Sequence, residues 1–250
     1  MHNHLRRATA AAFAASALAL LAACGDGAAD GKAATPRDET SAASASASPT
    51  PSEPAAEPLS SREAKKALLA DGDLPQGWKR DPELIIDASG GAPEDLLAKP
   101  ADATCLPLVD LFNTGRVADG YKANAQAVFL KGDSIFGHDV SAYAADKAES
   151  VMTALGKAVT GCGTFDSEYG GGKAKVTTKP LKVTEAGDET LGFSVKVDLG
   201  DEVVDVEYGV VRDGANITSV QHNWVDDHDA DAFTKGLAKA AEKLSAAAGN

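Results

Sequence analysis

The stretch TLGFSVKVDLGDEVVDVEYGVV, residues 190–211, contains two runs in which apolar and polar side chains alternate. Apolar positions that recur every second residue are typical of a strand with one face buried and the other in water. Gly200-Asp201 separates the two runs, and Asp213-Gly214 leads from the second run into NITSVQHNW. Such dipeptides favour tight hairpin turns. The stretch therefore predicts a C-terminal antiparallel meander.

Further strands are expected before the meander. The segments ANAQAVFLK and SIFGHDVSAY, at residues 123–131 and 134–143, are strand-like and flank a glycine-containing turn. KAKVTTKPLKV, residues 173–183, supplies another strand, in which Pro180 favours an edge or a bulge. Together with the meander, these segments predict an antiparallel sheet of about five to six strands.

Helices are expected on both sides of these segments along the chain. Ser60 and Glu63 have the spacing of a capping box at the start of a helix. Residues 144–159 carry apolar side chains at helical spacing and polar side chains between them. A last helix is expected from about Asp229, and a short one around Cys105.

The N-terminus has the layout of an exported lipoprotein. Two arginines precede a nearly uninterrupted apolar segment, residues 8–23, which is shorter than the roughly 20 residues that span a bilayer. The residues Leu21-Ala22-Ala23-Cys24 resemble a bacterial lipobox, which implies cleavage after Ala23 and diacylation of Cys24. The alternative is an ordinary cleaved signal peptide that happens to contain a cysteine.

The rest of the chain divides into a tether and one domain. Residues 24–58 are the lipidated cysteine and an Ala/Ser/Pro-rich segment, which is too poor in apolar side chains to fold and is expected to be disordered. Residues 59–250 are expected to form a single extracytoplasmic domain. The sequence thus predicts a protein held by its lipid on the outer face of the cytoplasmic membrane.

The charge balance excludes one class of partner. The chain has 24 basic and 37 acidic residues; residues 1–23 contain two of the basic residues and none of the acidic ones, which leaves 22 against 37 and a net charge of −15 after cleavage. An acidic surface repels nucleic-acid phosphates. We therefore expect no nucleic-acid partner.

Two cysteines remain once Cys24 is assigned to lipid. An oxidising compartment favours a disulfide between Cys105 and Cys162. The alternative, a redox-active or metal-binding pair, normally uses closer spacing such as C-x-x-C, which this chain lacks.

The densest group of chemically versatile side chains lies in HNWVDDHDAD, residues 222–231. His222, His228 and Asp227 are weak candidates for a metal site, because their spacing matches no usual set of zinc ligands. The same acidic residues are explained more simply as caps of the last helix. The sequence contains no recognised catalytic motif, so we expect no catalytic residue, no metal site and no cofactor.

The order of these features resembles the actinobacterial lipoproteins of the PknH-like extracellular sensor type. The shared landmarks are a lipobox, a linker, a capped helix leading to LPQGW, a cysteine on a short helix, a second cysteine after AADKAESVMTALGKAVTGC, a meander and a terminal helix. The resemblance implies an α+β domain whose antiparallel sheet packs its helices mainly on one face and leaves a cleft for a ligand. Members often carry a second disulfide, whereas this chain has cysteines for one.

These sequence features are compatible with three functions. The first is a non-enzymatic binding or sensor-type domain, whose ligand is an unknown small molecule, wall component or protein. The second is an envelope hydrolase or metal-dependent enzyme that uses His222, His228 and neighbouring aspartates. The third is a scaffold for another envelope protein. The absence of a catalytic motif favours the first.

Overall fold

The computed structural model describes residues 57–83, 97–98, 100, 102–169, 171–224 and 228–249, all within one compact unit, Pro49–Asn250. The predicted signal peptide, the lipid attachment site at Cys24 and nearly all of the predicted tether lie outside the described residues. None of the helices in the described ranges is long and apolar enough to cross a membrane.

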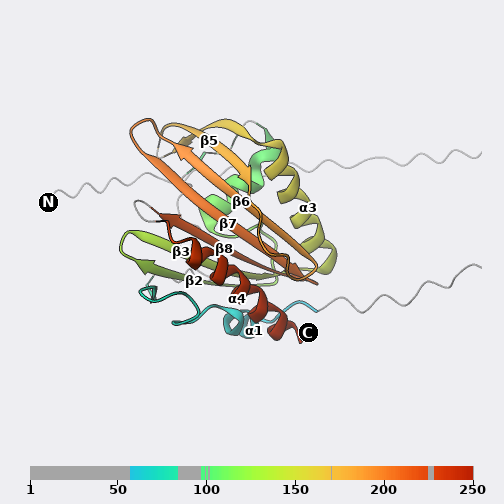
Figure 1. Cartoon of the computed structure of the whole chain (residues 1–250). Coiled ribbons are helices and arrows are strands. Elements are labelled where there is room, and N and C mark those ends of the chain that lie inside the picture. The colour runs from blue at the N-terminus through green and yellow to red at the C-terminus, as the bar shows by residue number, and fades with distance from the viewer. Residues whose placement is uncertain are drawn as a thin grey trace, which may run out of the picture. The chain divides into compact units, whose positions relative to one another are not determined.

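A single antiparallel sheet of eight strands forms the centre of the domain (Figure 1). Its strand order is β1-β2-β3-β8-β7-β6-β5-β4. The strands are β1 (Lys79–Asp81), β2 (Ala123–Lys131), β3 (Ser134–Ala142), β4 (Thr164–Tyr169), β5 (Gly172–Pro180), β6 (Glu189–Asp198), β7 (Val203–Asp213) and β8 (Asn216–Trp224). The predicted α+β class and the predicted meander, now β6 to β8, are confirmed.

The strand count exceeds the predicted five to six because both edge strands lack a readable apolar alternation. The edge strand β1 has three residues, and β4 is the largely polar sequence TFDSEY. Pro180 is the last residue of β5, in the part of that strand that extends beyond its pairing with β4. Its missing N–H therefore removes no ladder hydrogen bond.

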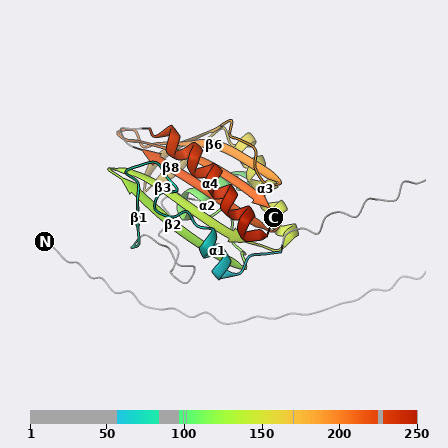
Figure 2. The same ribbon diagram turned by 60° about the horizontal axis from the view of Figure 1, so that its bottom comes forward.

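Helices cover both faces of the sheet, which differs from the expectation that they lie mainly on one. The helices α1 (Ser61–Ala67) and α4 (Ala230–Ala248) pack on one face, and α2 (Leu106–Thr114) and α3 (Ala145–Gly161) pack on the other. Figure 2 shows α4 crossing in front of the strands, with α2 and α3 behind them. Each face therefore has its own hydrophobic core.

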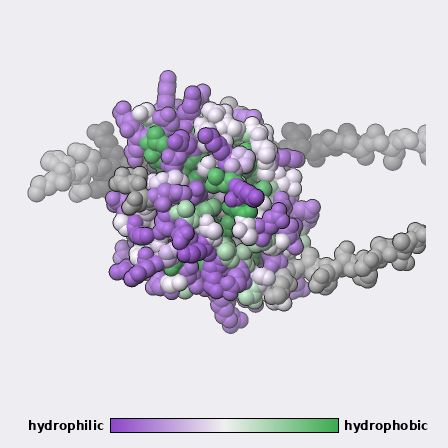
Figure 3. Space-filling view, viewed as in Figure 1, coloured by the Kyte–Doolittle hydropathy of each residue, from purple (hydrophilic) through white to green (hydrophobic). Residues whose placement is uncertain are grey.

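Side chains alternate between the two faces along each strand, so neighbouring residues of one strand belong to different cores. On β7, Val206, Tyr208 and Val210 contribute to the core under α3, whereas Val211 contributes to the core under α4. The predicted helix at residues 144–159 is α3, and its apolar stripe is buried. Hydrophilic side chains cover most of the face seen in Figure 3, and hydrophobic ones show between them near its middle.

Two predicted covalent and capping features are present. Ser60 and Glu63 form the capping box of α1. Cys105 and Cys162 form a disulfide with a Cα–Cα distance of 5.7 Å, which joins the start of α2 to the end of α3. For a sequence separation of 57 residues, the loop-entropy account gives a stabilisation of about 4 kcal/mol.

The start of the domain is attached to the middle of the sheet. Asn216, at the beginning of β8, is fully buried. Its Oδ1 accepts a hydrogen bond from Leu59 N at 2.8 Å, and its Nδ2 donates to Glu57 O at 3.1 Å. One amide side chain therefore satisfies two backbone groups of the segment that precedes α1.

The close packing of α4 on the sheet depends on glycine at position 236. A Cβ at this position would overlap the ring of Phe136 on β3. We predict that Gly236→Ala lowers the free energy of unfolding by about 1–3 kcal/mol, because overpacking outweighs the better helix propensity of alanine.

Gly156→Ala in α3 is the matched control. A Cβ there would meet only Leu191, at 3.9 Å, so the same substitution should raise the free energy of unfolding by up to about 1 kcal/mol. Urea unfolding of the full chain and both variants measures the two effects. Changes of the same sign in both helices would contradict the packing argument.

Candidate functional site

A cavity of about 570 Å³ opens on the sheet face that carries α2 and α3. The strands β2, β3, β7 and β8 form its floor, and the C-terminal end of α2 forms one side. We call it the polar pocket, after the side chains of its floor: Gln126, Asp139, Ser219, Gln221 and Asn223.

Strand register brings these side chains together from three strands. Gln126 on β2 lies opposite Asp139 on β3, and Asp139 lies opposite Ser219 on β8. Gln221 and Asn223 follow Ser219 on β8 at intervals of two residues, so they share its face. A Cβ at Gly137 would come within 2.7 Å of Gln221 Cγ, so glycine at this position leaves room for the Gln221 side chain.

Asp139 is the buried carboxyl group of the polar pocket, with 2% exposure. Burial raises the pKa of Asp139 to about 6, although hydrogen bonds from Ser141 and Asn124 oppose the shift. Ser141 Oγ donates to Asp139 Oδ1 at 2.7 Å, and Asn124 Nδ2 donates to Oδ2. A buried group with a pKa shifted toward neutral pH is a frequent mark of a functional site.

Two oxygens of the pocket floor have unused hydrogen-bonding capacity. Gln221 Oε1 and Asn223 Oδ1 are buried and have no hydrogen-bond partner among the described residues. Native proteins pair the great majority of buried polar atoms, so each such oxygen needs an explanation. A ligand that donates hydrogen bonds supplies one.

Apolar side chains line the polar pocket beside two exposed acidic residues, Asp133 and Glu202. Ile135 and Val203 are the exposed large hydrophobic residues in the described part of the chain, and both line this pocket. Phe112 and Tyr169 also line it and pack edge to face, with ring centroids 6.4 Å apart. The site therefore combines apolar walls with a few convergent polar groups, as small-molecule sites do.

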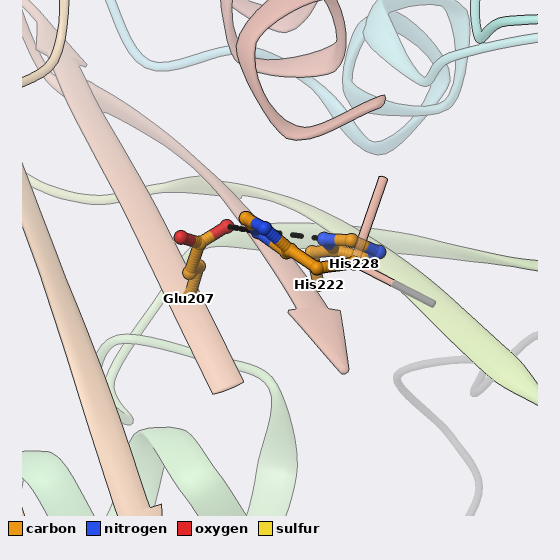
Figure 4. Close-up of side chains that lie close together, drawn as sticks. All are labelled: Glu207, His222 and His228. Carbon is orange, nitrogen blue, oxygen red and sulfur yellow. Dashed lines mark hydrogen bonds and ion pairs between the residues drawn. The ribbon is translucent and has the colours of Figure 1, made fainter. Parts of the chain in front are cut away.

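The predicted metal candidates lie on the opposite face of the sheet. His222 on β8 and His228, just before α4, come together with Glu207 of β7 (Figure 4). Asp227, the third candidate, lies outside the described residues. Sequence reasoning missed Glu207, although the predicted turn at Asp213-Gly214 gives the register that pairs it with His222.

The other acidic and histidine residues of interest have structural roles. Asp229 caps α4 by accepting a hydrogen bond from Ala232 N at 3.0 Å, as the capping interpretation predicts. Burial would raise the pKa of Asp229, but hydrogen bonds, first among them that from Lys131, lower it to about 2.

His138 is buried, and burial lowers its pKa to about 3. Its neutral ring accepts from Leu69 N at 3.0 Å.

Comparison with known proteins identifies the fold. No protein-family model and no curated protein matches the chain. The extracellular domain of PknH from Mycobacterium tuberculosis superimposes with a TM-score of 0.56 and 16% sequence identity, over 76% of this chain and 99% of that one. The chain therefore has the fold of a PknH-type extracellular domain, and the predicted resemblance is confirmed at that level.

A second solved structure gives a weaker match. It is an uncharacterized protein of Mycobacterium smegmatis, the Rv0999 ortholog, with a TM-score of 0.40 and 16% identity over 75% of this chain and 95% of that one. A score at this level does not define a shared fold.

The raised pKa of Asp139 predicts a distinct dependence of stability on pH. Between about pH 4 and 6 the folded state keeps a proton that the unfolded chain, with the ordinary pKa of 3.8, releases. The free energy of unfolding should therefore fall as pH rises through this range, by on the order of 3 kcal/mol from this group. Asp139→Asn, which cannot ionise, should lack that fall.

Urea unfolding of the full chain at several pH values from about 4 to 7 measures this difference. Asp166→Asn removes one exposed carboxylate from β4 and serves as the control, which should follow the wild-type profile. Parallel profiles for the wild type and Asp139→Asn would show that the buried carboxyl group does not titrate in this way.

Proposed function

We propose that the chain is a lipid-anchored, extracytoplasmic binding domain of sensor type, and that the polar pocket receives a small, hydroxyl-rich ligand such as a sugar. The observation that carries the proposal is the pair of unpartnered buried oxygens on the pocket floor, Gln221 Oε1 and Asn223 Oδ1. Both are acceptors, so they favour a ligand that presents donors.

The other properties of the pocket support the same ligand class. A volume of about 570 Å³ falls within the usual range for small-molecule sites. Phe112 and Tyr169 offer aromatic surface for the apolar face of a sugar ring. Asp139 becomes an anion as the pH rises above about 6, which disfavours an anionic ligand at neutral pH.

Binding without catalysis fits the contacts around the pocket. Ser219 Oγ donates to Gly115 O at 3.3 Å, and no base contacts this hydroxyl among the described residues. Ser141 does donate to Asp139, but Ser141 is fully buried and is not among the described lining residues. Neither serine is therefore a base-activated nucleophile that faces the pocket.

Calorimetric and thermal-shift titrations of the detergent-solubilised full chain test the ligand proposal. The probes are glucose, N-acetylglucosamine and trehalose at millimolar concentration. We expect at least one to bind and to raise the melting temperature. Gln221→Ala should weaken its binding about tenfold or more, because a ligand hydroxyl loses its acceptor.

Gln76→Ala is the matched control, since Gln76 is exposed in the turn before Trp78 and is not among the residues that line the polar pocket. It should bind the probe as the wild type does. The proposal fails if none of the three sugars binds, or if Gln221→Ala binds as tightly as the wild type.

The anchor is tested separately. Mass spectrometry of the protein purified from its native membrane should give a mature N-terminus at Cys24 that carries two acyl chains. Cys24→Ser should carry no lipid, whereas the double variant Cys105→Ser/Cys162→Ser should keep it. An intact leader, or an unacylated mature N-terminus, would contradict the predicted anchoring without affecting the ligand proposal.

A further inference from the structure

We infer that Glu207, His222 and His228 form a binding site for one divalent transition-metal ion, with Zn²⁺ as the best match. This trio, the metal cluster, lies on the sheet face opposite the polar pocket, and the inference does not depend on the proposed function. One potential ligand atom from each of the three residues lies within 4.8 Å of the other two.

The fold assembles the cluster from two adjacent strands and one connection. Glu207 on β7 and His222 on β8 are direct partners in the hairpin register, so their side chains leave the same face of the sheet. His228 belongs to the connection from β8 and immediately precedes Asp229, the cap of α4. Figure 4 shows the two imidazoles side by side, with the carboxylate directed at them.

His222 is the residue whose environment calls for a ligand. It is 0% exposed, and neither of its ring nitrogens has a hydrogen-bond partner among the described residues. Its Nδ1 lies 3.9 Å from Glu207 Oε2, beyond hydrogen-bond distance. An imidazole buried in this way loses its water without gaining a partner, and a metal ion supplies a partner for the nitrogen that faces Glu207, Nδ1.

Simple pairing accounts for His228 but not for His222. His228 Nε2 lies 2.8 Å from Glu207 Oε2, which is an ordinary hydrogen bond. The rings around His222 are Trp78, Phe136 and Trp224, at centroid distances of 5.3 to 6.2 Å. These three rings pack around His222. Its polar neighbours are Glu207 and His228.

The distances suit a tetrahedral ion. Zinc bonds of about 2.1 Å to nitrogen and oxygen place neighbouring ligand atoms about 3.4 Å apart. The observed separations from Glu207 Oε2, 2.8 Å to His228 Nε2 and 3.9 Å to His222 Nδ1, lie on either side of that value. The third separation, between the two histidine nitrogens, is within 4.8 Å, so shifts of up to about 1.5 Å would complete the geometry.

The donor set selects the kind of metal. Two imidazoles and one carboxylate are the ligands of many three-residue zinc sites, in which water takes the fourth position, whereas Ca²⁺ and Mg²⁺ prefer oxygen ligands. Burial alone would raise the pKa of Glu207, but the neighbouring His222 and His228 lower it below its usual value. The carboxylate is therefore ionised at neutral pH, as metal ligation requires.

An entry path is present. Glu207 also lines a groove of about 480 Å³ between α4 and residues 181–187. His228 has a side-chain exposure of 38%, whereas Glu207 has 15%. An ion bound here would connect β7, β8 and the segment that immediately precedes α4.

Both tryptophans of the chain report on the cluster. The ring centroids of Trp78 and His222 are 5.7 Å apart, and those of Trp224 and His228 are 4.3 Å apart. The chain contains two tryptophans in total, so its whole indole emission arises beside the site. Co²⁺ quenches nearby indoles and, in a tetrahedral site, absorbs strongly in the visible range.

The experiment is a titration of the detergent-solubilised full chain, first stripped with a chelator, with Co²⁺ and then with competing Zn²⁺. We expect one equivalent of Co²⁺ to quench the emission and to give the tetrahedral absorption, and Zn²⁺ to displace it. Glu207→Gln and His228→Asn should each weaken binding at least about tenfold, since the loss of outer-shell partners alone costs that much.

Asp205→Asn is the matched control. Asp205 lies two residues before Glu207 on the same strand and pairs with Lys196 at 3.4 Å, outside the cluster. It should bind the metal as the wild type does. His222→Asn could disturb the core, so the two partly exposed ligands carry the test, and the metal-free emission spectrum of each variant checks its fold.

His2, His4 and Cys24 are unchanged in every variant, so a difference between variants cannot arise from them. The inference is overturned if one-to-one binding is absent, if both ligand variants bind as the wild type does, or if Asp205→Asn loses as much affinity as they do.

Discussion

The register of the β7–β8 hairpin is the constraint on which both candidate sites depend. The turn at Asp213-Gly214 pairs Tyr208 with Gln221 and Glu207 with His222. Because successive side chains of a strand point to opposite faces, the first pair belongs to the polar pocket and the second to the metal cluster. A slip of one residue would exchange the two faces and abolish both arrangements, so the apolar pattern that fixes the register also fixes the chemistry.

Each face of the sheet has its own means of holding its helices. On the pocket side, the disulfide joins α2 to α3, and the C-terminal end of α2 forms part of the pocket wall. On the other side, α4 is held by close packing at Gly236 and by the cap at Asp229, which also accepts hydrogen bonds from Trp78 and Lys131. A substitution in the contacts that hold the helices on one face therefore leaves the contacts on the other face in place.

Much of the fold can be predicted from the sequence, because local patterns encode it. The meander, the helix predicted at residues 144–159 and the capping box follow from spacing that the chain shows directly. The disulfide follows from the predicted export and from the two cysteines that remain after lipidation. The short β1 and the polar β4 do not, since neither has an apolar period to detect. The polar pocket is assembled from three strands by long-range register, and single segments such as SIFGHDVSA look like ordinary strand. His222 and His228 were recognisable as neighbours, but Glu207 required the hairpin pairing as well.

The attachment of the N-terminal segment to Asn216 has a mechanical consequence. Glu57 and Leu59 are bonded to the first residue of β8, which is flanked by strands on both sides. Tension on the preceding part of the chain would therefore load these two hydrogen bonds, at the end of an interior strand, before it reaches α1.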